Sequence, residues 1–501
     1  MNLYQRFLDA AAGCESAVAV ETPGRGAWTH GELHAAVRRC SSVLLAAGVA
    51  PGDRVTVQVE KSFENLILYM AVLRIGAVHM PLNTAYTEAE LEYFIGDAEP
   101  RVLVCDPERY AELSTLGERM GLAAVFTLGA DGAGTLSDAM VENLTAAEVC
   151  SREPDDLAAI VYTSGTTGRS KGAMLSHGNL FANASTLRDI WGWQADDVLL
   201  HALPIYHVHG LFVALHCALL DPSKVLLLPR FDLDAVLEAL PQSTVLMGVP
   251  TFYVRLLADE RFDRERCAGM RLFISGSAPL LPETFNAFEE RTGVRILERY
   301  GMTEAGMITS NPLEGERVAG TVGFPLPDVQ VRLRGTEGEP VPDAGVGVLE
   351  IRGPNVFSGY WRQPERTAAE FRDGWFVTGD LAEQDPQGRV SIVGRHKDLI
   401  ISGGLNIYPR EVEAELNAIP GVEESAVIGV PHADFGEAVM ALVVAGEDWP
   451  GEAAAIAALK HRLAGFKVPR KILKVASLPR NAMGKVQKNL LRNAHLDTFA
   501  N

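Results

Sequence analysis

The chain has 501 residues, of which 47% are hydrophobic, and its formal net charge is −19 at pH 7. This length favours two or more domains, and so negative a charge argues against non-specific binding of nucleic acid. No run of about 18 apolar residues occurs, and the N-terminal sequence lacks a basic leader before an apolar block, so we expect neither a membrane span nor a signal peptide. The six cysteines are scattered without a C-x-x-C pair, which argues against disulfides and structural zinc and favours a cytoplasmic location.

Strand-like and helix-like segments alternate over residues 50–310. The apolar runs "DRVTVQV" and "STVLMGVP" each precede a helical pattern, "ENLILYMAVLRIG" and "TFYVRLLADERF", and this order is typical of layered α/β folds. Residues 320–395 change to short strands and turns, which predict a small β-rich segment. We therefore expect an α/β protein with a large N-terminal domain, residues 1–395. A small, mobile α+β C-terminal domain, residues 396–501, is expected to follow, with a helix whose first turn contains Pro409.

The glycine-rich stretch "YTSGTTGRSKG", residues 162–172, follows the apolar run "LAAIV". It is not a Walker A loop, because Ser170 stands where that pattern requires its second glycine. The run "GAML" after Lys171 predicts a strand, and the next helix is expected to start at Ser176 or Asn179. The stretch therefore joins strand to strand, and its N–H and hydroxyl groups can donate to phosphate. A flexible surface turn is the alternative, against which the lysine and the preceding buried strand argue.

Residues 460–501 contain ten lysines or arginines and one acid, Asp497. A basic tail on an acidic chain can be a solvated face and nothing more. The alternative is that the tail closes over an anionic substrate.

Six motifs occur in the order in which they occur in the acyl-adenylate-forming superfamily, which contains acyl-CoA synthetases, luciferases and the adenylation domains of peptide synthetases. They are "YTSGTTGRSKG" (162–172), "SGSAPL" (275–280), "ERYGMTE" (298–304), "WFVTGD" (375–380), "GRHKDLI" (394–400) and "PRNAMGKVQK" (479–488). The chain resembles this superfamily over essentially its whole length. Within it, "LPIYHVHGLF", "GVPTFYVRLL" and "PLNTAYT" resemble the malonyl-CoA synthetases. The resemblance implies that a carboxylate attacks the α-phosphate of Mg·ATP, and that coenzyme A then displaces AMP.

The resemblance also implies roles for the residues in these motifs. The residues expected to bind the β- and γ-phosphates are Thr163, Ser164, Gly165, Thr166, Thr167, Gly168 and Lys171. Those expected around the adenine ring are Ser277, Ala278, Pro279, Tyr300 and Gly301, with Met302 next to them in the sequence. Asp380 and Arg395 are expected to contact the ribose. Small residues admit the adenine ring, on which Tyr300 stacks. Taken alone, Asp380 would be interpreted as a turn residue.

Thr303 and Glu304 resemble the pair that holds the α-phosphate and Mg²⁺, and a hard cation prefers oxygen ligands such as a carboxylate. Glu304 by itself would be interpreted as a helix-start acid. Lys485 is the expected catalytic lysine, because an ammonium can stabilise the charge that develops during adenylation. Its place in the basic tail favours the interpretation of that tail as a lid.

Two further features of the C-terminal domain follow from the resemblance. Lys397 matches the hinge about which this domain turns between the half-reactions. The adjacent glycines Gly403 and Gly404 can allow close backbone approach of coenzyme A.

A malonate substrate requires a cation for its second carboxylate. Arg255 is the first candidate. Its spacing alone favours the solvent-exposed face of an amphipathic helix, whereas the resemblance to malonyl-CoA synthetases favours a place in the acyl pocket. Arg299 is the reserve candidate, and Ser275 is expected to hydrogen-bond malonate. His207 and His209 are expected to wall the pocket, with His207 also a candidate catalytic residue. Ordinary helix-start histidines are the alternative.

The expected function is malonyl-CoA synthesis from malonate, ATP and coenzyme A, with methylmalonate as a further acid. The main alternative is a CoA ligase for another short-chain or aryl acid, which would have a deep apolar pocket without an arginine. A carrier-protein adenylation module would be expected to include a carrier domain, and a luciferase-like oxygenase would need a luciferin pocket. A non-catalytic nucleotide-binding homologue is the last alternative. The presence of Lys171, Glu304, Asp380 and Lys485 argues against it.

A regulatory hypothesis concerns the same lysine. Pro479, Gly484 and Lys485 resemble the context in which related synthetases are acetylated, so a protein acetyltransferase and a deacetylase acting on Lys485 are expected partners. Acetylation would remove the charge that the chemistry needs.

Overall fold

The computed structural model describes residues 1–140, 148–163, 170–335, 338–342, 345–402, 405–432, 435–481 and 484–499. The chain divides into two compact units. The N-terminal unit comprises Met1–Gln330 and Arg352–Gly374, and the C-terminal unit comprises Val331–Ile351 and Trp375–Asn501. The C-terminal unit thus includes much of the β-rich segment that precedes residue 396, while the expected domain boundary itself stays a prediction. No helix in the described ranges is both long and apolar enough to cross a membrane.

The N-terminal unit contains most of the helices. They are α1 (Leu3–Ala10), α2 (His30–Ala46), α3 (Phe63–Arg74), α4 (Glu88–Ala98), α5 (Tyr110–Met120), α6 (Thr135–Ala139), α7 (His177–Ile190), α8 (His216–Leu220), α9 (Leu233–Ala239), α10 (Pro250–Leu257), α11 (Pro282–Thr292) and α12 (Pro364–Ala369). Short helical turns are η1 (Pro107–Arg109) and η3 (Leu240–Gln242), and η2 (His209–Leu215) is a π-helical segment.

A seven-stranded sheet has the order β18-β8-β7-β4-β3-β5-β6. Its strands are β3 (Arg54–Gln58), β4 (Val78–Pro81), β5 (Val102–Cys105), β6 (Ala124–Thr127), β7 (Leu157–Thr163), β8 (Lys171–Ser176) and β18 (Gly359–Tyr360). Strands β3 to β7 pair in parallel, whereas β7 and β8 are antiparallel. The prediction that the glycine-rich stretch joins strand to strand is therefore confirmed.

A nine-stranded sheet has the order β15-β14-β13-β12-β11-β9-β10-β1-β2. Its strands are β1 (Val18–Thr22), β2 (Gly26–Thr29), β9 (Val198–His201), β10 (Lys224–Leu227), β11 (Val245–Gly248), β12 (Leu272–Ser275), β13 (Leu297–Met302), β14 (Gly306–Ser310) and β15 (Phe324–Pro325). Its central strands are parallel, and a short strand, β19 (Phe371–Arg372), follows α12.

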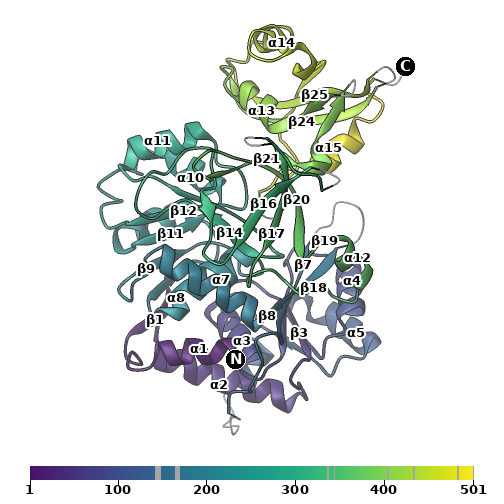
Figure 1. Cartoon of the computed structure of the whole chain (residues 1–501). Helices are drawn as coiled ribbons and strands as arrows, with labels where there is room; N and C mark the ends of the chain where they lie inside the picture. The colour runs from purple at the N-terminus through teal and green to yellow at the C-terminus, as the bar shows by residue number, and fades with distance from the viewer. Residues whose placement is uncertain are drawn as a thin grey trace. The chain divides into compact units, whose positions relative to one another are not determined.

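Helices cover both sheets of the N-terminal unit, which confirms the layered α/β prediction. Helix α3 packs against β4 and α7 against β8, and α7 in turn contacts α8 and β14. Every residue of α3 except Glu64 is buried, as expected for a helix that is apolar on all sides. Helices α4 and α5 cover the other face of the seven-stranded sheet, and α10 and α11 lie beside β11 and β12 (Figure 1).

The C-terminal unit contains two groups of strands. The first is β16 (Gln330–Arg334), β17 (Gly347–Arg352), β20 (Trp375–Gln384) and β21 (Val390–Arg395), and the second is β22 (Ile400–Ser402), β23 (Leu405–Ile407), β24 (Val422–His432), β25 (Gly436–Ala445) and β26 (Lys471–Lys474). Its helices are α13 (Pro409–Asn417), α14 (Glu452–Lys460) and α15 (Lys488–Ala494), with the short turns η4 (His396–Asp398) and η5 (Gly465–Lys467). Pro409 is the first residue of α13, as predicted.

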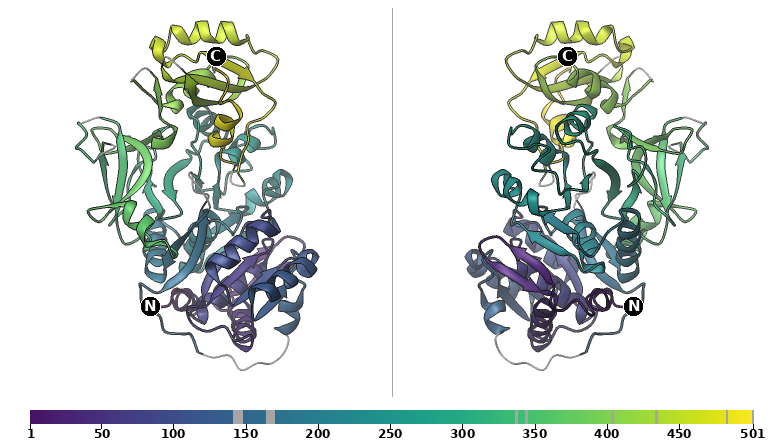
Figure 2. Two further views of the ribbon diagram at one scale, coloured as in Figure 1. Left: turned by 90° about the vertical axis from the view of Figure 1, so that its right-hand side faces the viewer. Right: turned by 90° about the vertical axis from the view of Figure 1, so that its left-hand side faces the viewer.

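The sheet formed by β22–β26 is covered on both faces. Alternate side chains of β24 and β25 point to opposite sides, so Val427 and Val439 pack with α13 and α14, whereas Ile428 and Met440 pack with Leu491 of α15. Helix α14 lies over the strands of this sheet in both side views (Figure 2).

Candidate active site

The hairpin of β7 and β8 holds both ends of the glycine-rich stretch. Thr163 pairs with Lys171 across the hairpin, and the Tyr93 hydroxyl donates to the Ser170 carbonyl over 2.8 Å. Residues 164–169 lie outside the described part of the chain, so the roles predicted for Ser164, Gly165, Thr166, Thr167 and Gly168 stay predictions. The hairpin therefore fixes where the stretch begins and ends.

Lys171 is buried, with 7% of its surface exposed. Its Nζ lies 2.7 Å from Oε1 of Glu370 and 4.1 Å from the centre of the Tyr360 ring. The Tyr360 hydroxyl lies 2.6 Å from Oε2 of Glu370 and 3.0 Å from Oε1 of Glu304. One tyrosine thus connects the lysine of the glycine-rich stretch with the glutamate that was expected to hold Mg²⁺.

Glu304 is a buried carboxyl group, with 6% of its surface exposed. Burial raises its pKa, whereas the hydrogen bond to Tyr360 and the charge of Lys171 act in the opposite direction. Among the described residues, no group of three or more His, Cys, Asp or Glu side chains could hold a metal ion. A single carboxylate suits Mg²⁺, which is commonly bound by one or two carboxylates together with the phosphates of its substrate.

The residues predicted around adenine lie at the carboxyl ends of two neighbouring parallel strands. Tyr300 and Gly301 are in β13, and Ser277 follows β12. Ser277 has a φ of 70°, a conformation that is uncommon for residues other than glycine and that often occurs at functional sites. Its Oγ lies 3.2 Å from Nδ1 of His209, so the expected adenine site adjoins the expected acyl pocket.

Arg299 is buried within β13, with 2% of its surface exposed. Its Nε and Nη2 atoms have no hydrogen-bond partner among the described residues, and the same is true of Ser275 Oγ and His209 Nε2. Burial lowers the pKa of Arg299 to about 9, and the charges of Tyr253 and Glu298 oppose this shift. The guanidinium is therefore charged at neutral pH. The charge of Arg299 acts on His209, and buried donors without partners are costly, so these two side chains are suited to an anionic ligand.

Arg255 lies in a different environment. It is an exposed residue of α10, and its guanidinium lies 5.9 Å from the centre of the Phe231 ring. His207 is half-buried, and its Nδ1 accepts a hydrogen bond from the His209 backbone N–H over 3.3 Å. The structure thus brings Arg299, Ser275 and His209 into the interior and leaves Arg255 on the surface of its helix.

The C-terminal unit brings four other predicted residues together. Arg395 Nε lies 3.0 Å from Oδ1 of Asp380, and these residues pair across β20 and β21. Lys485 is an exposed residue. Loss of hydration is the first cause that lowers its pKa to about 8, with the Arg395 and Lys397 charges adding to the shift and Asp380 opposing it. Burial also lowers the pKa of Lys397. Gly403 and Gly404 lie outside the described residues.

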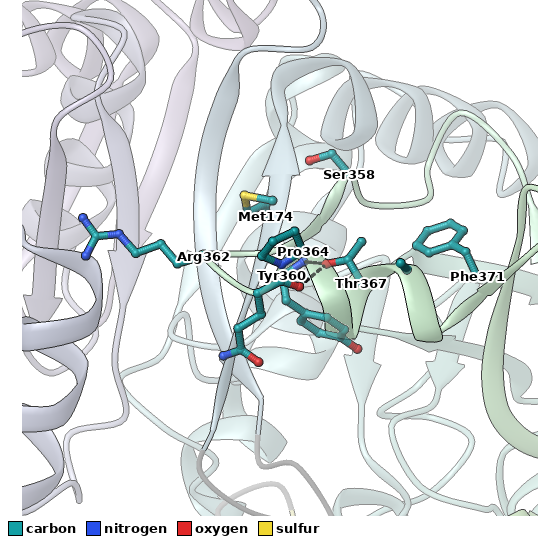
Figure 3. Close-up of a pocket in the computed structure, with 9 residues that line it drawn as sticks. Met174, Ser358, Tyr360, Arg362, Pro364, Thr367 and Phe371 are labelled. Carbon is teal, nitrogen blue, oxygen red and sulfur yellow. Dashed lines mark hydrogen bonds between the residues drawn. The ribbon is translucent and has the colours of Figure 1, made fainter.

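A cavity of about 560 Å³ lies elsewhere in the N-terminal unit, beside β8, β18 and α12. Figure 3 shows Tyr360 next to Thr367, whose Oγ1 accepts a hydrogen bond from the Tyr360 backbone N–H over 2.9 Å. Arg362 extends away from the other lining residues in this view and pairs with Glu99. None of the site residues predicted from the sequence lines this cavity. Tyr360 is the residue that connects the cavity with Glu304.

The chain belongs to the family of AMP-binding enzymes, whose model matches residues 7–361, and the model of the AMP-binding enzyme C-terminal domain matches residues 411–485. The crystal structure of ATP-bound MatB from Rhodopseudomonas palustris is similar to it with a TM-score of 0.97 and 52% identity, over 99% of each chain. Feruloyl-CoA synthase of an Amycolatopsis species is 38% identical over 94% of each chain. Malonate–CoA ligase of Arabidopsis thaliana is 33% identical over 97% of this chain and 88% of its own.

These similarities confirm the resemblance to the acyl-adenylate-forming superfamily and to malonate–CoA ligases. The chain is an AMP-forming acid–CoA ligase. The relatives differ in the acid that their names specify, so the similarity leaves the acid open.

Sequence reasoning missed two residues that contact the expected nucleotide site. Glu370 is 199 positions from its partner Lys171, and Tyr360 is 56 positions from Glu304. Hydrophobic periodicity indicates which local segment forms a helix or a strand. It gives no information on contacts between residues that are so many positions apart in the sequence. Their nearest signal is the glycine-aromatic run "SGYW" around Tyr360, which marks a turn rather than a site.

Proposed function

We propose that the protein is a malonyl-CoA synthetase. It would convert ATP, malonate and coenzyme A into malonyl-CoA, AMP and diphosphate through malonyl-AMP. The observation that supports malonate is Arg299, a buried arginine with two unpartnered nitrogens among the described residues, whose charge acts on the buried imidazole of His209. A monocarboxylic acid with an apolar tail would leave this guanidinium without a partner, and that loss is costly in a buried site.

In this proposal Arg299 binds the carboxylate of malonate that does not react. The planar guanidinium can donate two parallel hydrogen bonds to a carboxylate, and His209 Nε2 is a further unpartnered polar atom among the described residues. Ser275 Oγ is also unpartnered among them, but Ser275 pairs with Glu298 across β12 and β13, so its side chain faces the opposite side of the sheet from that of Arg299. Arg255 remains a second candidate, and its exposure on α10 makes it the weaker one. The second substrate of the same class would be methylmalonate, since one methyl group changes affinity by only ~1–3 kcal/mol.

The first half-reaction is the attack of a malonate oxygen on the α-phosphorus of ATP, with diphosphate as the leaving group. Lys171 would hold the β- and γ-phosphates, and Lys485 would stabilise the charge between the carboxylate and the α-phosphate. Mg²⁺, held by Glu304 with Thr303 beside it, would neutralise phosphate charge when bound. Asp380, oriented by Arg395 at 3.0 Å, would accept hydrogen bonds from the ribose hydroxyls.

The second half-reaction is the attack of the thiol sulfur of coenzyme A on the malonyl carbonyl carbon, with AMP as the leaving group. Lys397 would be the hinge between the two half-reactions, and Gly403 and Gly404 would lie against the pantetheine chain. These assignments rest on the resemblance of the motifs, and coenzyme A as substrate is supported by the CoA ligases among the relatives.

The test is CoA-dependent AMP formation from Mg·ATP with malonate, methylmalonate, acetate, propionate and a phenylpropenoate. We expect malonate to exceed acetate in kcat/KM on the order of 30- to several-thousand-fold, which corresponds to ~2–5 kcal/mol for a salt-bridged carboxylate. Arg299→Met should abolish this preference, and the matched Arg255→Ala should leave it largely intact.

Each other outcome has a definite meaning. A preference that survives Arg299→Met and is lost in Arg255→Ala would move the anchor to Arg255. Equal turnover of malonate and acetate would contradict the malonate proposal. Turnover of the phenylpropenoate alone would favour the aryl-acid alternative, which the similarity to feruloyl-CoA synthase supports.

A further inference from the structure

Lys61 is a buried lysine of the N-terminal unit, with 5% of its surface exposed. Its Nζ donates to the carbonyl of Leu203 over 2.7 Å and to the carbonyl of His201 over 3.1 Å, and it lies 3.2 Å from Nδ1 of His201. An ammonium group has three N–H donors, so these three acceptors match its donors. The hydrogen bonds of this lysine therefore converge on the segment that follows β9.

The tautomer of His201 follows from its surroundings. Burial and the nearby charge of Lys61 lower the pKa of His201 to about 3, so its ring is neutral near pH 7. A neutral imidazole has one N–H group. Because Nδ1 faces the Lys61 donor, the proton is assigned to Nε2, which then donates to the Gly210 carbonyl over 2.9 Å. A continuous hydrogen-bonded path thus leads from Lys61 through His201 to Gly210.

This path ties both ends of the segment that contains the pocket histidines. We call residues 203–210 the pocket loop: Lys61 binds its first residue, and His201 binds its last. The loop is folded tightly, because a Cβ on Gly210 would lie 2.1 Å from the Pro204 carbonyl oxygen. The π-helical segment η2, a geometry that is often found at functional sites, begins at His209.

The pocket loop determines where the two histidines lie. His209 contacts Ser277 through its Nδ1 over 3.2 Å, and its backbone N–H donates to the His207 ring. If the loop moved, both imidazoles would move relative to Arg299 of β13. Burying an ammonium in this place is costly unless all its donors are satisfied, and an apolar side chain would have filled the space without that cost.

We propose that Lys61 is a positioning residue for the acid substrate, which acts through His201 to fix the pocket loop and hence His207 and His209. The proposal rests on the proposed function in one respect, namely that these histidines line the pocket for the acid. Lys61 touches neither the acid nor the nucleotide in this proposal. Its loss should therefore weaken binding of the acid much more than binding of ATP, whose expected site adjoins the pocket loop through the contact of His209 with Ser277.

The experiment compares Lys61→Met and His201→Phe with the wild type in the full-length protein. The KM for the acid and the KM for ATP are measured in adenylate formation, by exchange of labelled diphosphate into ATP. We expect the KM for the acid to rise about tenfold or more in both variants, and the KM for ATP to stay within about twofold. Hydrogen exchange of peptides spanning residues 203–210 should be faster in both.

A matched control separates positioning from general damage to the core. His79 is another buried histidine of the N-terminal unit, in β4, with 1% of its surface exposed. His79→Phe makes the same substitution as His201→Phe at a histidine whose Nδ1 has no hydrogen-bond partner among the described residues. We expect it to lower thermal stability to a similar or smaller extent, without changing the KM for the acid or the exchange of residues 203–210.

The acid in these assays is the one that the wild type uses best, so a failure of the malonate proposal leaves this test intact. Three results would overturn the proposal. One is folded Lys61→Met with an unchanged KM for the acid. The second is a parallel rise in both KM values, which would indicate a structural role alone. The third is unchanged hydrogen exchange in the pocket loop, because the lysine would then not be what holds it.

Discussion

At the scale of single residues, Tyr360 connects two side chains that the sequence separates widely. Its hydroxyl contacts Glu304 and Glu370, and its ring lies under the ammonium of Lys171. The ring and the hydroxyl thus act on different partners. A cation over an aromatic face is stabilised by the ring alone, whereas the carboxylates depend on the hydroxyl.

Tyr360→Phe is expected to raise the KM for Mg·ATP about tenfold, or ~1.4 kcal/mol, because the one hydroxyl proton that Glu304 and Glu370 share is lost while the ring remains. The measurement is adenylate formation over a series of ATP and Mg²⁺ concentrations. Tyr162→Phe is the matched control, since the Tyr162 hydroxyl donates to Asp97 over 2.5 Å beside the same hairpin. That variant should lose stability and keep its KM for ATP. A normal KM in Tyr360→Phe would show that the hydroxyl does not organise the nucleotide site.

Lys485 gives a prediction on pH. Its pKa of about 8 lies below the ordinary 10.5, so in the folded enzyme the ammonium loses its proton as pH rises through about 8. If this charge drives adenylation, the rate of adenylate formation at limiting ATP should fall above that pH and be insensitive to this group well below it. The rate of thioester formation from supplied acyl-AMP serves as the comparison, and it should not show this fall above about pH 8. The inhibition of adenylation by acetylation of Lys485 stays a prediction. It has the same physical basis, because acetylation also removes the charge of this lysine.

At the scale of elements, the β7–β8 hairpin and helix α7 follow from local sequence. Ser176 is the N-cap of α7, where its side chain accepts from the Asn179 N–H and the Asn179 side chain accepts from the Ser176 N–H, each over 3.0 Å. The prediction of a helix start at Ser176 is thus confirmed. A reciprocal pair of this kind satisfies two backbone donors that the helix cannot satisfy itself.

Ser176→Ala should lower the free energy of unfolding by about 1 kcal/mol, because a helix N-cap is lost. Ser176→Asp retains a capping oxygen and should recover most of that loss. The midpoint of urea unfolding, followed by circular dichroism, measures both. Since α7 packs against β8 and contains none of the site residues predicted from the sequence, the KM for ATP should not change. An equal loss of stability in the two variants would argue that the cap contributes little.

At the scale of the whole molecule, the C-terminal sheet has a core of its own. The two clusters on either face of β24 and β25 are formed entirely by residues between Ile400 and Phe499. A hydrophobic core that is complete within a segment allows that segment to fold by itself. A hydrogen bond from the Arg410 guanidinium to the Ile392 carbonyl joins α13 to β21 as well, but it adds no apolar area to either cluster.

We expect a fragment of residues 396–501 to fold without the rest of the chain and to show no adenylation. Circular dichroism and dispersion of amide signals in an NMR spectrum test folding. A fragment of residues 375–501, which adds β20 and β21, is the comparison. An unfolded short fragment beside a folded long one would move the domain boundary from residue 396 to the start of β20.

Much of the fold could be predicted because its signals are local. The apolar runs at β3 and β11, the helices that follow them, and the start of α13 at Pro409 depend on residues within one or two turns. Asp380 and Arg395 were both predicted to contact the ribose, and the two side chains form an ion pair within the C-terminal unit. The roles of the site residues stay predictions.

The sequence by itself determined the superfamily, the alternation of strands and helices, and which residues belong to the motifs, because each depends on order and spacing along the chain. The tertiary structure alone decided which arginine is buried. Arg255 follows the apolar run "TFYV" and Arg299 follows Glu298, yet α10 presents Arg255 to the surface while Arg299 of β13 is buried. Burial depends on what packs against an element, and residues far away in the sequence supply that packing. The partners of Lys171 and Lys61 were decided in the same way.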